Sequence, residues 1–342
     1  MKAVVRGRRV QPLAEVLAEE FRDRAYMSEL SALVGQPSHE AVEQFIQELT
    51  LAHLGARASG SIFAIKSAGA VFGLVLENGE RAVLKLFSPS FSSSELLAIH
   101  RFMTIAATQG FPVPRVRSEL FEAAPGVWGA FYAYLDGEQR DAHTPVVRRE
   151  LARSLAELTA LLAPVDASEL PLTPARLDSL WPPAQRLPDR GALEEEDARF
   201  IDAHAAAAQQ LIKKSKLPRI AAHLDWGAKN VRFRDDTVCA VYDWDSLRAA
   251  SEAECAGRAA AQFTAQWDIP ALLTPTPDEA KAFFEDYQAA RGKRFSRAER
   301  AVAAAAARYR VAQVARLELA TGIPEGDNFR GLLRAYDSEP LL

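Results

Sequence analysis

The sequence predicts an α+β protein in two parts, a small antiparallel sheet followed by a mostly helical region. Two observations favour this order. An Asn78-Gly79 pair between apolar runs indicates a hairpin of strands at 70–77 and 80–87. After Gly137, apolar residues recur mainly at helical spacing. With 342 residues, 49% hydrophobic and 25% charged, the composition is that of a globular protein long enough for two lobes.

The first part is expected to contain helices, then strands. Residues 1–53 have helical spacing, with a break at Gly35-Gln36-Pro37 and Ser38 as the cap of the next helix. Further on, the sequence predicts strands at 61–66, 70–77 and 80–87, a helix from Glu95 to about Thr108, and strands at 113–121 and 127–135. A glycine follows the last strand at Leu135-Asp136-Gly137. We therefore expect a helical extension over 1–37, a smaller N-terminal lobe over 38–136 and a larger, mostly helical C-terminal lobe over 137–342.

The second part is expected to be helical around one small hairpin. Five prolines in 171–191 indicate an irregular segment. A short strand at 219–222 and a two-stranded ribbon flank a loop at 223–230. The predicted helices are 146–163, 193–213, about 251–266, 278–290, 297–320 and 327–335.

Charge and cysteine content exclude several classes of protein. A net charge of −4 gives no electrostatic reason to bind nucleic acid or an anionic membrane. The two cysteines, Cys239 and Cys255, indicate a reduced compartment rather than a disulfide scaffold. No apolar run approaches the roughly 18 residues of a spanning helix. We expect a cytoplasmic protein with no nucleic-acid or membrane partner; the oligomeric state is left open.

The loop His223-Leu224-Asp225-Trp226-Gly227-Ala228-Lys229-Asn230, followed by Asp243, has the residues that phosphoryl transfer requires. One carboxylate, Asp225, orients and deprotonates an alcohol. The amide oxygen of Asn230 and the carboxylate of Asp243 hold Mg²⁺ on the phosphates of ATP. The ribbon between them returns the chain so that both reach one metal. His223 is better interpreted as a residue that positions the backbone.

Each of these residues also has a purely structural interpretation. Asp225 is a common N-cap or turn residue, and Asn230 is a common turn former. Asp243 is placed to cap the segment that follows it.

A second group of residues points to the nucleotide. Lys85 lies in a predicted strand on the same face as Val83 and Phe87, where a charge needs a partner. ATP phosphates and the carboxylate of Glu95 would supply one. The alternatives are an edge-strand lysine that discourages aggregation and a glutamate that favours a helix N-terminus.

The loop before the second strand is the candidate phosphate-binding loop. It contains a single glycine, Gly69, so its signal is weak. Backbone N–H groups from Ser67 onward are nevertheless placed to approach phosphate. We include Ser67 and Gly69 among the predicted nucleotide-binding residues.

These residues resemble the aminoglycoside phosphotransferase and choline-kinase-like superfamily over roughly 40–335. Its pattern His-Gly-Asp-x-x-x-x-Asn, with a later Ile-Asp-Trp, reads here as His223-Leu224-Asp225 through Asn230 and as Tyr242-Asp243-Trp244. The resemblance implies a two-lobed protein-kinase-like fold. It implies that Asp225 is the base and that Asn230 and Asp243 bind Mg²⁺. It also implies that Lys85 contacts the α- and β-phosphates of ATP, with Glu95 as its partner.

The chain departs from the family pattern at several positions. Leu224 replaces glycine, Trp226 stands where leucine is common, and Ala228-Lys229 replaces Pro-Gly. A structural aspartate after the metal-binding aspartate is missing or replaced by Glu252 or Glu254. The charged groups that the chemistry needs are all present, so the core chemistry is expected to survive these changes. The departures themselves suggest a branch away from the antibiotic-resistance enzymes.

The function expected is transfer of the γ-phosphoryl group of ATP to a hydroxyl of a small polar molecule, with an aminoglycoside or amino-sugar as the leading class. A choline- or hydroxy-amino-acid-type kinase and a nucleotide-binding pseudokinase or regulator are the alternatives. A protein kinase is disfavoured because no long activation segment follows Asp243.

Two sets of side chains are candidates for binding the acceptor. Acidic residues after the loop would attract an amine or are simply solvated charges: Asp245, Glu252, Glu254 and Asp268. Three tryptophans are candidates for stacking, although core packing is expected for at least two of them: Trp181, Trp244 and Trp267.

Overall fold

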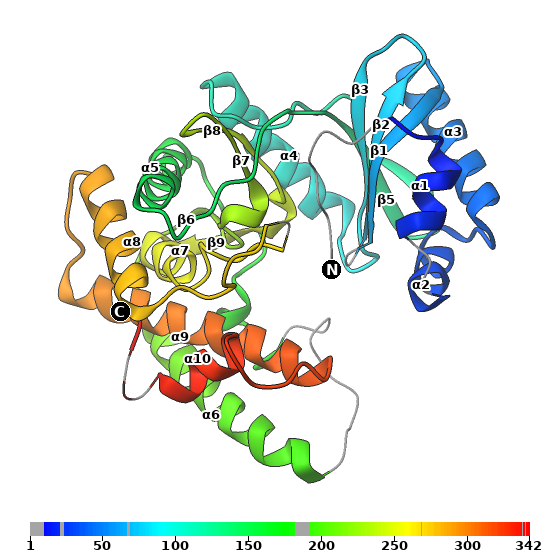
Figure 1. The fold of residues 1–342 in the computed structure, drawn as a ribbon. Helices are drawn as coiled ribbons and strands as arrows, with labels where there is room; N and C mark the ends of the chain where they lie inside the picture. The colour runs from blue at the N-terminus through cyan, green and yellow to red at the C-terminus, as the bar shows by residue number, and fades with distance from the viewer. Residues whose placement is uncertain are drawn as a thin grey trace. The chain divides into compact units, whose positions relative to one another are not determined.

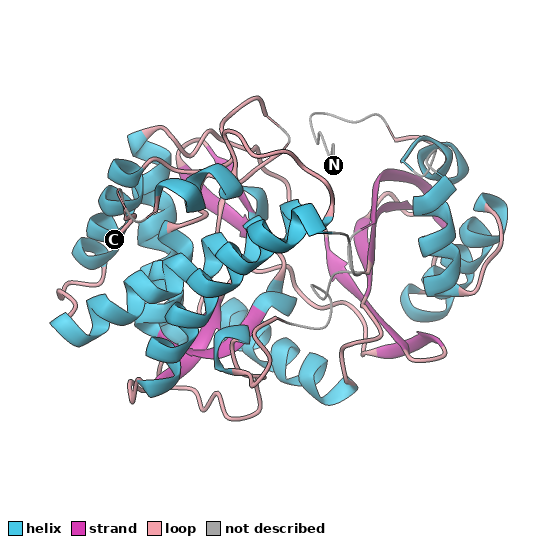
Figure 2. Ribbon diagram, turned by 90° about the horizontal axis from the view of Figure 1, so that it is seen from below, coloured by secondary structure: helices cyan, strands magenta, loops and turns pink. Residues whose placement is uncertain are grey.

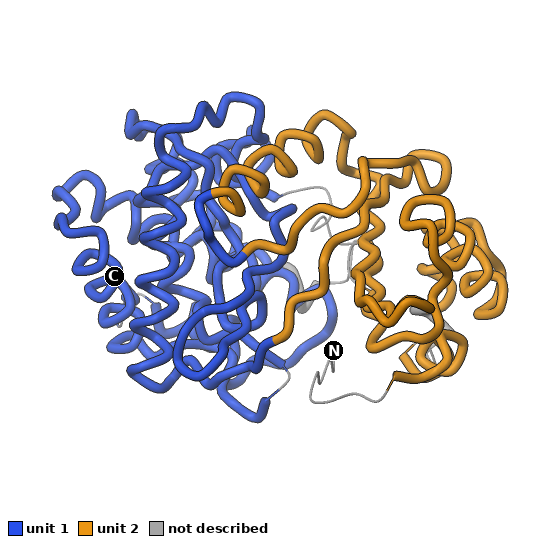
Figure 3. The backbone as a smooth tube through the Cα atoms, turned by 90° about the horizontal axis from the view of Figure 1, so that it is seen from above, with its two compact units in different colours: residues 1–2, 109–112, 137–342 blue, residues 3–108, 113–136 orange. Residues whose placement is uncertain are grey.

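The computed structural model describes residues 10–20, 24–66, 69–181, 192–267, 269–336, 338 and 340–342. The chain divides into two compact units, coloured separately in Figure 3. The larger contains Gln109–Pro112 and Gly137–Leu342, and the smaller contains the described residues before Gln109 together with Val113–Asp136. Each unit has its own hydrophobic core.

The smaller unit is built on a five-stranded antiparallel sheet in the order β1-β2-β3-β5-β4. The strands are β1 (Ala58–Lys66), β2 (Ala70–Leu76), β3 (Arg81–Leu86), β4 (Phe121–Ala124) and β5 (Val127–Ala133). The predicted hairpin is confirmed, since Val75 of β2 pairs with Arg81 of β3 across the Asn78-Gly79 turn. The side chain of Asn78 accepts the N–H of Glu80 at 3.0 Å, which stabilises this turn.

Four helices complete this unit: α1 (Leu13–Glu20), α2 (Arg24–Val34), α3 (His39–Leu54) and α4 (Ser93–Thr108). Helices α1, α2 and α3 lie on one side of the sheet (Figure 1). Their apolar faces bury Leu17 and Ile46 in one cluster with Phe72 and Leu84 of the sheet. The expected cap is present, because the hydroxyl of Ser38 accepts the N–H of Ala41 at 3.2 Å.

The larger unit is mostly helical, with two short antiparallel strand pairs (Figure 2). Its α-helices are α5 (Pro145–Leu162), α6 (Ala192–Lys214), α7 (Glu252–Ala260), α8 (Pro277–Ala290), α9 (Arg297–Ala320) and α10 (Phe329–Ala335). Strands β6 (Arg219–His223) and β9 (Leu247–Ser251) form one pair, and β7 (Val231–Arg234) and β8 (Thr237–Val241) form the other. Short 3₁₀ turns lie at η1 (Pro174–Arg176), η3 (Ala228–Asn230) and η4 (Trp244–Ser246). Within the part of the chain that the structure describes, no helix is both long and apolar enough to cross a bilayer.

Helix α9 is the centre of the larger unit, since it packs against α6, α7 and α10. Its run of buried alanines allows neighbouring backbones to come close. One such close approach is at Gly257 of α7, where an added Cβ would lie 2.0 Å from the carbonyl oxygen of Ala303. This contact fixes α7, and α7 and the turn after it hold the loop that contains Asp225.

Two sequence expectations about elements are wrong, and one strand was missed. No strand spans 113–121: Val116 makes only an isolated bridge to Tyr132, and Pro112 and Pro114 have no N–H to donate to a ladder. Strand β9 was not predicted, because its sequence Leu-Arg-Ala-Ala-Ser lacks the alternation that marks a half-buried strand. The helix expected to reach residue 266 ends at Ala260, and the chain then turns through Thr264.

Replacing Gly257 by alanine should lower the free energy of unfolding by about 1–3 kcal/mol. Alanine is favoured over glycine in a helix by about 1 kcal/mol. A net loss of stability in this variant must therefore come from the collision of the new Cβ with Ala303. Urea unfolding measures the change. The matched control is Gly326→Ala, whose added Cβ meets nothing within 4 Å. Equal stability of the two variants would contradict the close packing of α7 on α9.

Candidate active site

The loop that contains Asp225 begins at the C-terminal end of β6. It is held in place by α7 and by the turn that follows α7. The carbonyl oxygen of Leu224 accepts hydrogen bonds from Arg258 Nε at 3.3 Å and Gln262 Nε2 at 2.9 Å. Four and five residues after Leu224, the N–H groups of Ala228 and Lys229 donate to the carbonyls of Phe263 and Ala265. The loop backbone is therefore fixed on both sides of Asp225.

Trp226 explains one departure from the family pattern. Its side chain is fully buried, and its indole N–H donates to the carbonyl oxygen of Leu151 on α5 at 3.1 Å. The ring also meets the imidazole of His223 edge-on at 5.6 Å. A large side chain here ties the loop to α5, a contact that a leucine would make without the hydrogen bond.

Asp225 and Asn230 are in direct contact. The amide nitrogen of Asn230 donates to the carbonyl oxygen of Asp225 at 2.8 Å and to its Oδ2 at 3.0 Å. Because the nitrogen is used in this way, the amide oxygen of Asn230 is the atom that can ligate a metal. The turn-former interpretation of Asn230 is therefore incomplete, since its side chain orients the candidate base.

Asp243 is brought next to this pair by its backbone. Strands β7 and β8 pair Val231 with Val241, and the N–H of Tyr242 then donates to the carbonyl oxygen of Asn230 at 2.8 Å. Asp243 follows with φ 61° and ψ 42°, a left-handed conformation that aspartate tolerates better than most residues. It occupies the position before η4, but its side chain makes no capping hydrogen bond there.

His223 positions this backbone, as the sequence predicted. Its Nε2 lies 2.8 Å from the carbonyl oxygen of Tyr242, which can only accept, so Nε2 carries the proton. Its Nδ1 lies 3.2 Å from the hydroxyl of Ser246, which donates to it. Burial lowers the pKa of His223, and the opposing charges of Asp243 and Asp225 do not overcome it. A neutral imidazole thus links the ends of the two segments that contain the predicted site residues.

Two cations hold the carboxylate of Asp225, and neither was assigned a role from the sequence. Lys229 Nζ lies 2.7 Å from Oδ2, and Arg310 Nη2 of α9 lies 2.8 Å from Oδ1. We call Asp225, Lys229 and Arg310 the ion-pair cluster. Burial alone would raise the pKa of Asp225, but Lys229 and Arg310 outweigh it and hold this pKa well below its usual range.

Arg310 is itself fixed by side chains around it. Its Nε donates to Gln262 and its Nη1 donates to Gln313, while Nη2 is used by Asp225. Gln313 also accepts from Arg258 at 3.0 Å. Burial, with the nearby charge of Arg310, lowers the pKa of Arg258 to about 9. The i,i+4 spacing of Lys229 from Asp225 could have signalled the first cation, but nothing local signals Arg310, 85 residues away.

The predicted nucleotide-binding residues lie in the smaller unit. Lys85 is half-buried in β3, with its ammonium 5.6 Å from the ring of Phe87. Gly69 packs tightly at the start of β2, where a Cβ would lie 2.0 Å from the carbonyl oxygen of Leu86. Ser67 is outside the described residues. The phosphate contacts of these residues remain predictions.

Glu95 acts at the N-terminus of α4. Its Oε2 accepts the N–H of Ser92 at 2.9 Å and the hydroxyl of Ser92 at 3.0 Å. This is the helix-favouring role that the sequence left as an alternative. Pairing of Glu95 with Lys85 stays a prediction.

Glu254 and Glu252 are the two glutamates that the sequence suggested in place of the structural aspartate of the family, and Glu254 is deeply buried. Its side chain is 1% exposed and lies 2.9 Å from Arg176 Nη2. It also closes a capping box with Ser251 at the start of α7. Glu252 accepts from the hydroxyl of Tyr287 and from Arg291, both at 2.8 Å. These two carboxylates therefore have structural partners, while Asp268 is outside the described residues.

The tryptophans divide as expected, with two of the three in the core. Trp181 and Trp244 are 8% and 3% exposed, and each donates its indole N–H within the larger unit. Trp267 is 46% exposed, and the ammonium of Lys229 lies 5.3 Å from its ring centre. Trp267 is thus the tryptophan of these three that presents a ring beside the ion-pair cluster.

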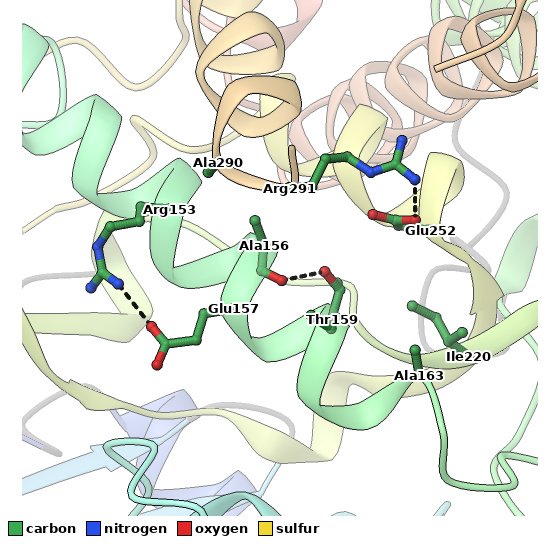
Figure 4. Close-up of a pocket in the computed structure, with 10 residues that line it drawn as sticks. Arg153, Ala156, Glu157, Thr159, Ala163, Ile220, Glu252, Ala290 and Arg291 are labelled. Atoms are coloured by element: carbon green, nitrogen blue, oxygen red, sulfur yellow. Dashed lines mark hydrogen bonds and ion pairs between the residues drawn. The ribbon is translucent and has the colours of Figure 1, made fainter. Parts of the chain in front are cut away.

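A cavity of about 440 Å³ lies elsewhere in this unit, between α5, α8, β6 and the start of α7 (Figure 4). Its charged lining residues pair with one another: Arg153 with Glu157, and Arg291 with Glu252, each at 2.8 Å. Ile220, which lines it, is near the start of β6, whereas Asp225 lies beyond the other end of that strand. The cavity is therefore separate from the site around Asp225.

Comparison with protein families shows that the chain is a phosphotransferase with an alcohol group as acceptor. The model of the phosphotransferase enzyme family matches residues 66–304, which is more than half of the chain, and the chain belongs to that family. The predicted resemblance and the predicted α+β kinase-like fold are confirmed. A search of the curated proteins finds no match.

Solved structures share the fold at low identity. The amicoumacin kinase hAmiN in complex with AMP-PNP, Ca²⁺ and Ami has a TM-score of 0.69 at 12% identity, covering 92% of this chain and 97% of that one. The spectinomycin phosphotransferase APH(9)-Ia with ADP and spectinomycin has a TM-score of 0.58 at 14% identity, covering 86% and 98%. An ethanolamine kinase from Plasmodium vivax has a TM-score of 0.53 at 12% identity, covering 96% and 98%.

Removing the charge of Glu254 by Glu254→Gln should lower the free energy of unfolding by about 3–5 kcal/mol, because it leaves the buried guanidinium of Arg176 without its carboxylate. Denaturant unfolding measures the loss. The control is Glu157→Gln at an ion pair whose two side chains are about half exposed, where the change should stay within about 1 kcal/mol. A Glu254→Gln protein as stable as the control would show that the buried pair contributes nothing.

Proposed function

We propose that this protein transfers the γ-phosphoryl group of ATP to a hydroxyl of a small polar molecule, with Asp225 as the base and Asn230 and Asp243 as Mg²⁺ ligands. The observation that supports this most is the contact of Asn230 with Asp225. This contact orients the carboxylate of Asp225 through the amide nitrogen of Asn230, and it leaves the amide oxygen as the atom that could bind a metal. A pseudokinase would not need both features.

The reaction follows from the position of Asp225. The acceptor hydroxyl donates a hydrogen bond to the carboxylate, and its oxygen forms a bond to the γ-phosphorus. The bond from phosphorus to the bridging oxygen breaks, its electron pair leaves with ADP, and the hydroxyl proton passes to Asp225. Because Lys229 and Arg310 keep the pKa of Asp225 low, the carboxylate orients the hydroxyl and accepts the proton late. This suits the loose transition state of phosphoryl transfer.

The residues present fit a magnesium ion that is shared with phosphates. Asn230 offers its amide oxygen and Asp243 its carboxylate, and Mg²⁺ commonly takes one or two carboxylates plus substrate phosphates. When bound, the metal neutralises charge on the phosphates. In the smaller unit, we propose that Lys85 contacts the α- and β-phosphates, supported by Glu95, and that the backbone at Ser67 and Gly69 approaches them.

For the acceptor, we propose an aminoglycoside or amino-sugar. The similar structures named for spectinomycin and amicoumacin support this class. The exposed ring of Trp267 offers a face on which a sugar can stack. The likeness to an ethanolamine kinase supports the second class, small hydroxylated amines and hydroxy amino acids. An ADP-release screen over amino-sugars, choline-like amines, hydroxy amino acids and nucleosides decides between them.

Asp225→Asn should lower kcat by roughly 10²-fold or more, because the asparagine amide has the shape of the carboxylate but cannot act as a base. Its affinity for Mg-ATP should stay at the wild-type level. Calorimetry measures the affinity, and the ADP-release screen measures kcat. Turnover near the wild-type rate would remove Asp225 from this role.

Asp243→Ala should abolish the magnesium-dependent part of ATP binding, since one of two protein ligands is lost. Calorimetry with and without Mg²⁺ measures that part. The control is Asp236→Ala at the tip of the β7–β8 hairpin, where the side chain is 55% exposed and pairs with Arg140. If Asp243→Ala binds Mg-ATP as tightly as the control, Asp243 is not a metal ligand.

A further inference from the structure

The ammonium of Lys229 occupies an unusual place in the loop. It lies 2.7 Å from Oδ2 of Asp225, and its side chain is 15% exposed. The backbone N–H of Lys229 is fixed by the carbonyl of Ala265, and the ring of Trp267 lies 5.3 Å from the ammonium. The chain thus places a nearly buried cation against the group that receives the acceptor hydroxyl.

We propose that Lys229 is a second catalytic residue, whose ammonium contacts the phosphoryl group in transfer while it also holds the carboxylate of Asp225. The inference rests on the proposed function, because it assumes that the hydroxyl reacts at Asp225. The family pattern has glycine at this position, so the charge is a property of this chain.

Simple geometry supports the contact. A hydroxyl bound to Asp225 lies about 2.6–3.2 Å from a carboxylate oxygen. Its oxygen is the atom that becomes bonded to phosphorus. Since Lys229 Nζ is already 2.7 Å from Oδ2, the new bond forms within reach of an ammonium on a flexible four-carbon stem. An ammonium has three N–H donors, so it can serve a phosphoryl oxygen and Asp225 together.

The negative charge of the phosphoryl group favours its contact with the ammonium of Lys229. In the transition state of phosphoryl transfer, negative charge spreads over the three equatorial oxygens of the phosphoryl group that is being transferred. A cation in a partly buried site stabilises such charge more than it would in water. As the bond to ADP breaks and the hydroxyl proton moves to Asp225, the attraction of Asp225 for Lys229 weakens. The ammonium is then available to the phosphoryl oxygens.

Arg310 can hold Asp225 while Lys229 contacts the phosphoryl group. It holds Oδ1 of Asp225 at 2.8 Å, while its other nitrogens are bonded to Gln262 and Gln313. The guanidinium is therefore fixed in place. Asp225 keeps one orienting partner when Lys229 turns toward the phosphoryl group. Arg310 is a positioning residue, and Lys229 is the residue that touches the reacting atoms.

The test is a double-mutant cycle of Lys229 and Asp225 in the full-length protein. The assay follows the labelled γ-phosphoryl group of Mg-ATP, either as phosphate released by hydrolysis or as product formed from an acceptor that the screen identifies. Lys229→Met should lower kcat by about tenfold or more while the KM for Mg-ATP changes little, because the contact is made in the transition state. Lys229→Arg should recover most of the rate. Lys214→Met, at the exposed end of α6, is the matched control and should leave the rate unchanged.

The Asp225→Asn background separates contact with phosphate from an effect through Asp225. If Lys229 touches the phosphoryl group, Lys229→Met slows the residual turnover of Asp225→Asn further. If the second change has no further effect, Lys229 acts only on Asp225 and the inference is overturned. Equal kcat for wild type and Lys229→Met would also overturn it. A wild-type protein with no turnover that depends on Asp225 would instead refute the proposed function.

Discussion

The ion pairs of Asp225 are the interaction on which this account depends. A carboxylate that is 20% exposed and flanked by Lys229 and Arg310 stays ionised and keeps one orientation. The side chain of Asn230 adds a third contact to the same group. These contacts come from one loop and one distant helix, so the geometry of the site requires that α9 be correctly packed.

The architecture of the larger unit provides that packing. Helix α9 supplies Arg310 and packs against α7, and α7 and its following turn hold the loop through Arg258 and Gln262. The contact of Gly257 with Ala303 sets how closely these helices approach. A change in this contact would move Arg310 relative to Asp225 without touching either residue. The stability of the core and the geometry of the site are therefore linked.

The sequence predicted the parts of the site that are local. Asp225 and Asn230 lie in one loop, and the ribbon that returns the chain to Asp243 is bounded by recognisable apolar strands. What it could not predict depends on distant pairing. Strand β9 forms because β6 offers it a partner, and its own residues give little signal. Arg310 is an ordinary arginine in an alanine-rich helix until the fold brings it to Asp225.

Departures from the family pattern gave more information than they first suggested. Trp226 anchors the loop to α5, Glu254 pairs with the buried Arg176, and Lys229 adds a charge where the family has glycine. The sequence marked all three as differences but could not say what each one contacts. Their partners, Leu151, Arg176 and Asp225, became known only from the fold.

The most direct test of the central claim is a crystal structure with Mn²⁺ and a non-hydrolysable ATP analogue, in which the anomalous signal locates the metal. The account predicts that the metal is bound by the amide oxygen of Asn230 and a carboxylate oxygen of Asp243, at about 2.0–2.3 Å, with the γ-phosphoryl group facing Asp225. A metal bound by other residues, or a γ-phosphoryl group turned away from Asp225 and Lys229, would contradict it.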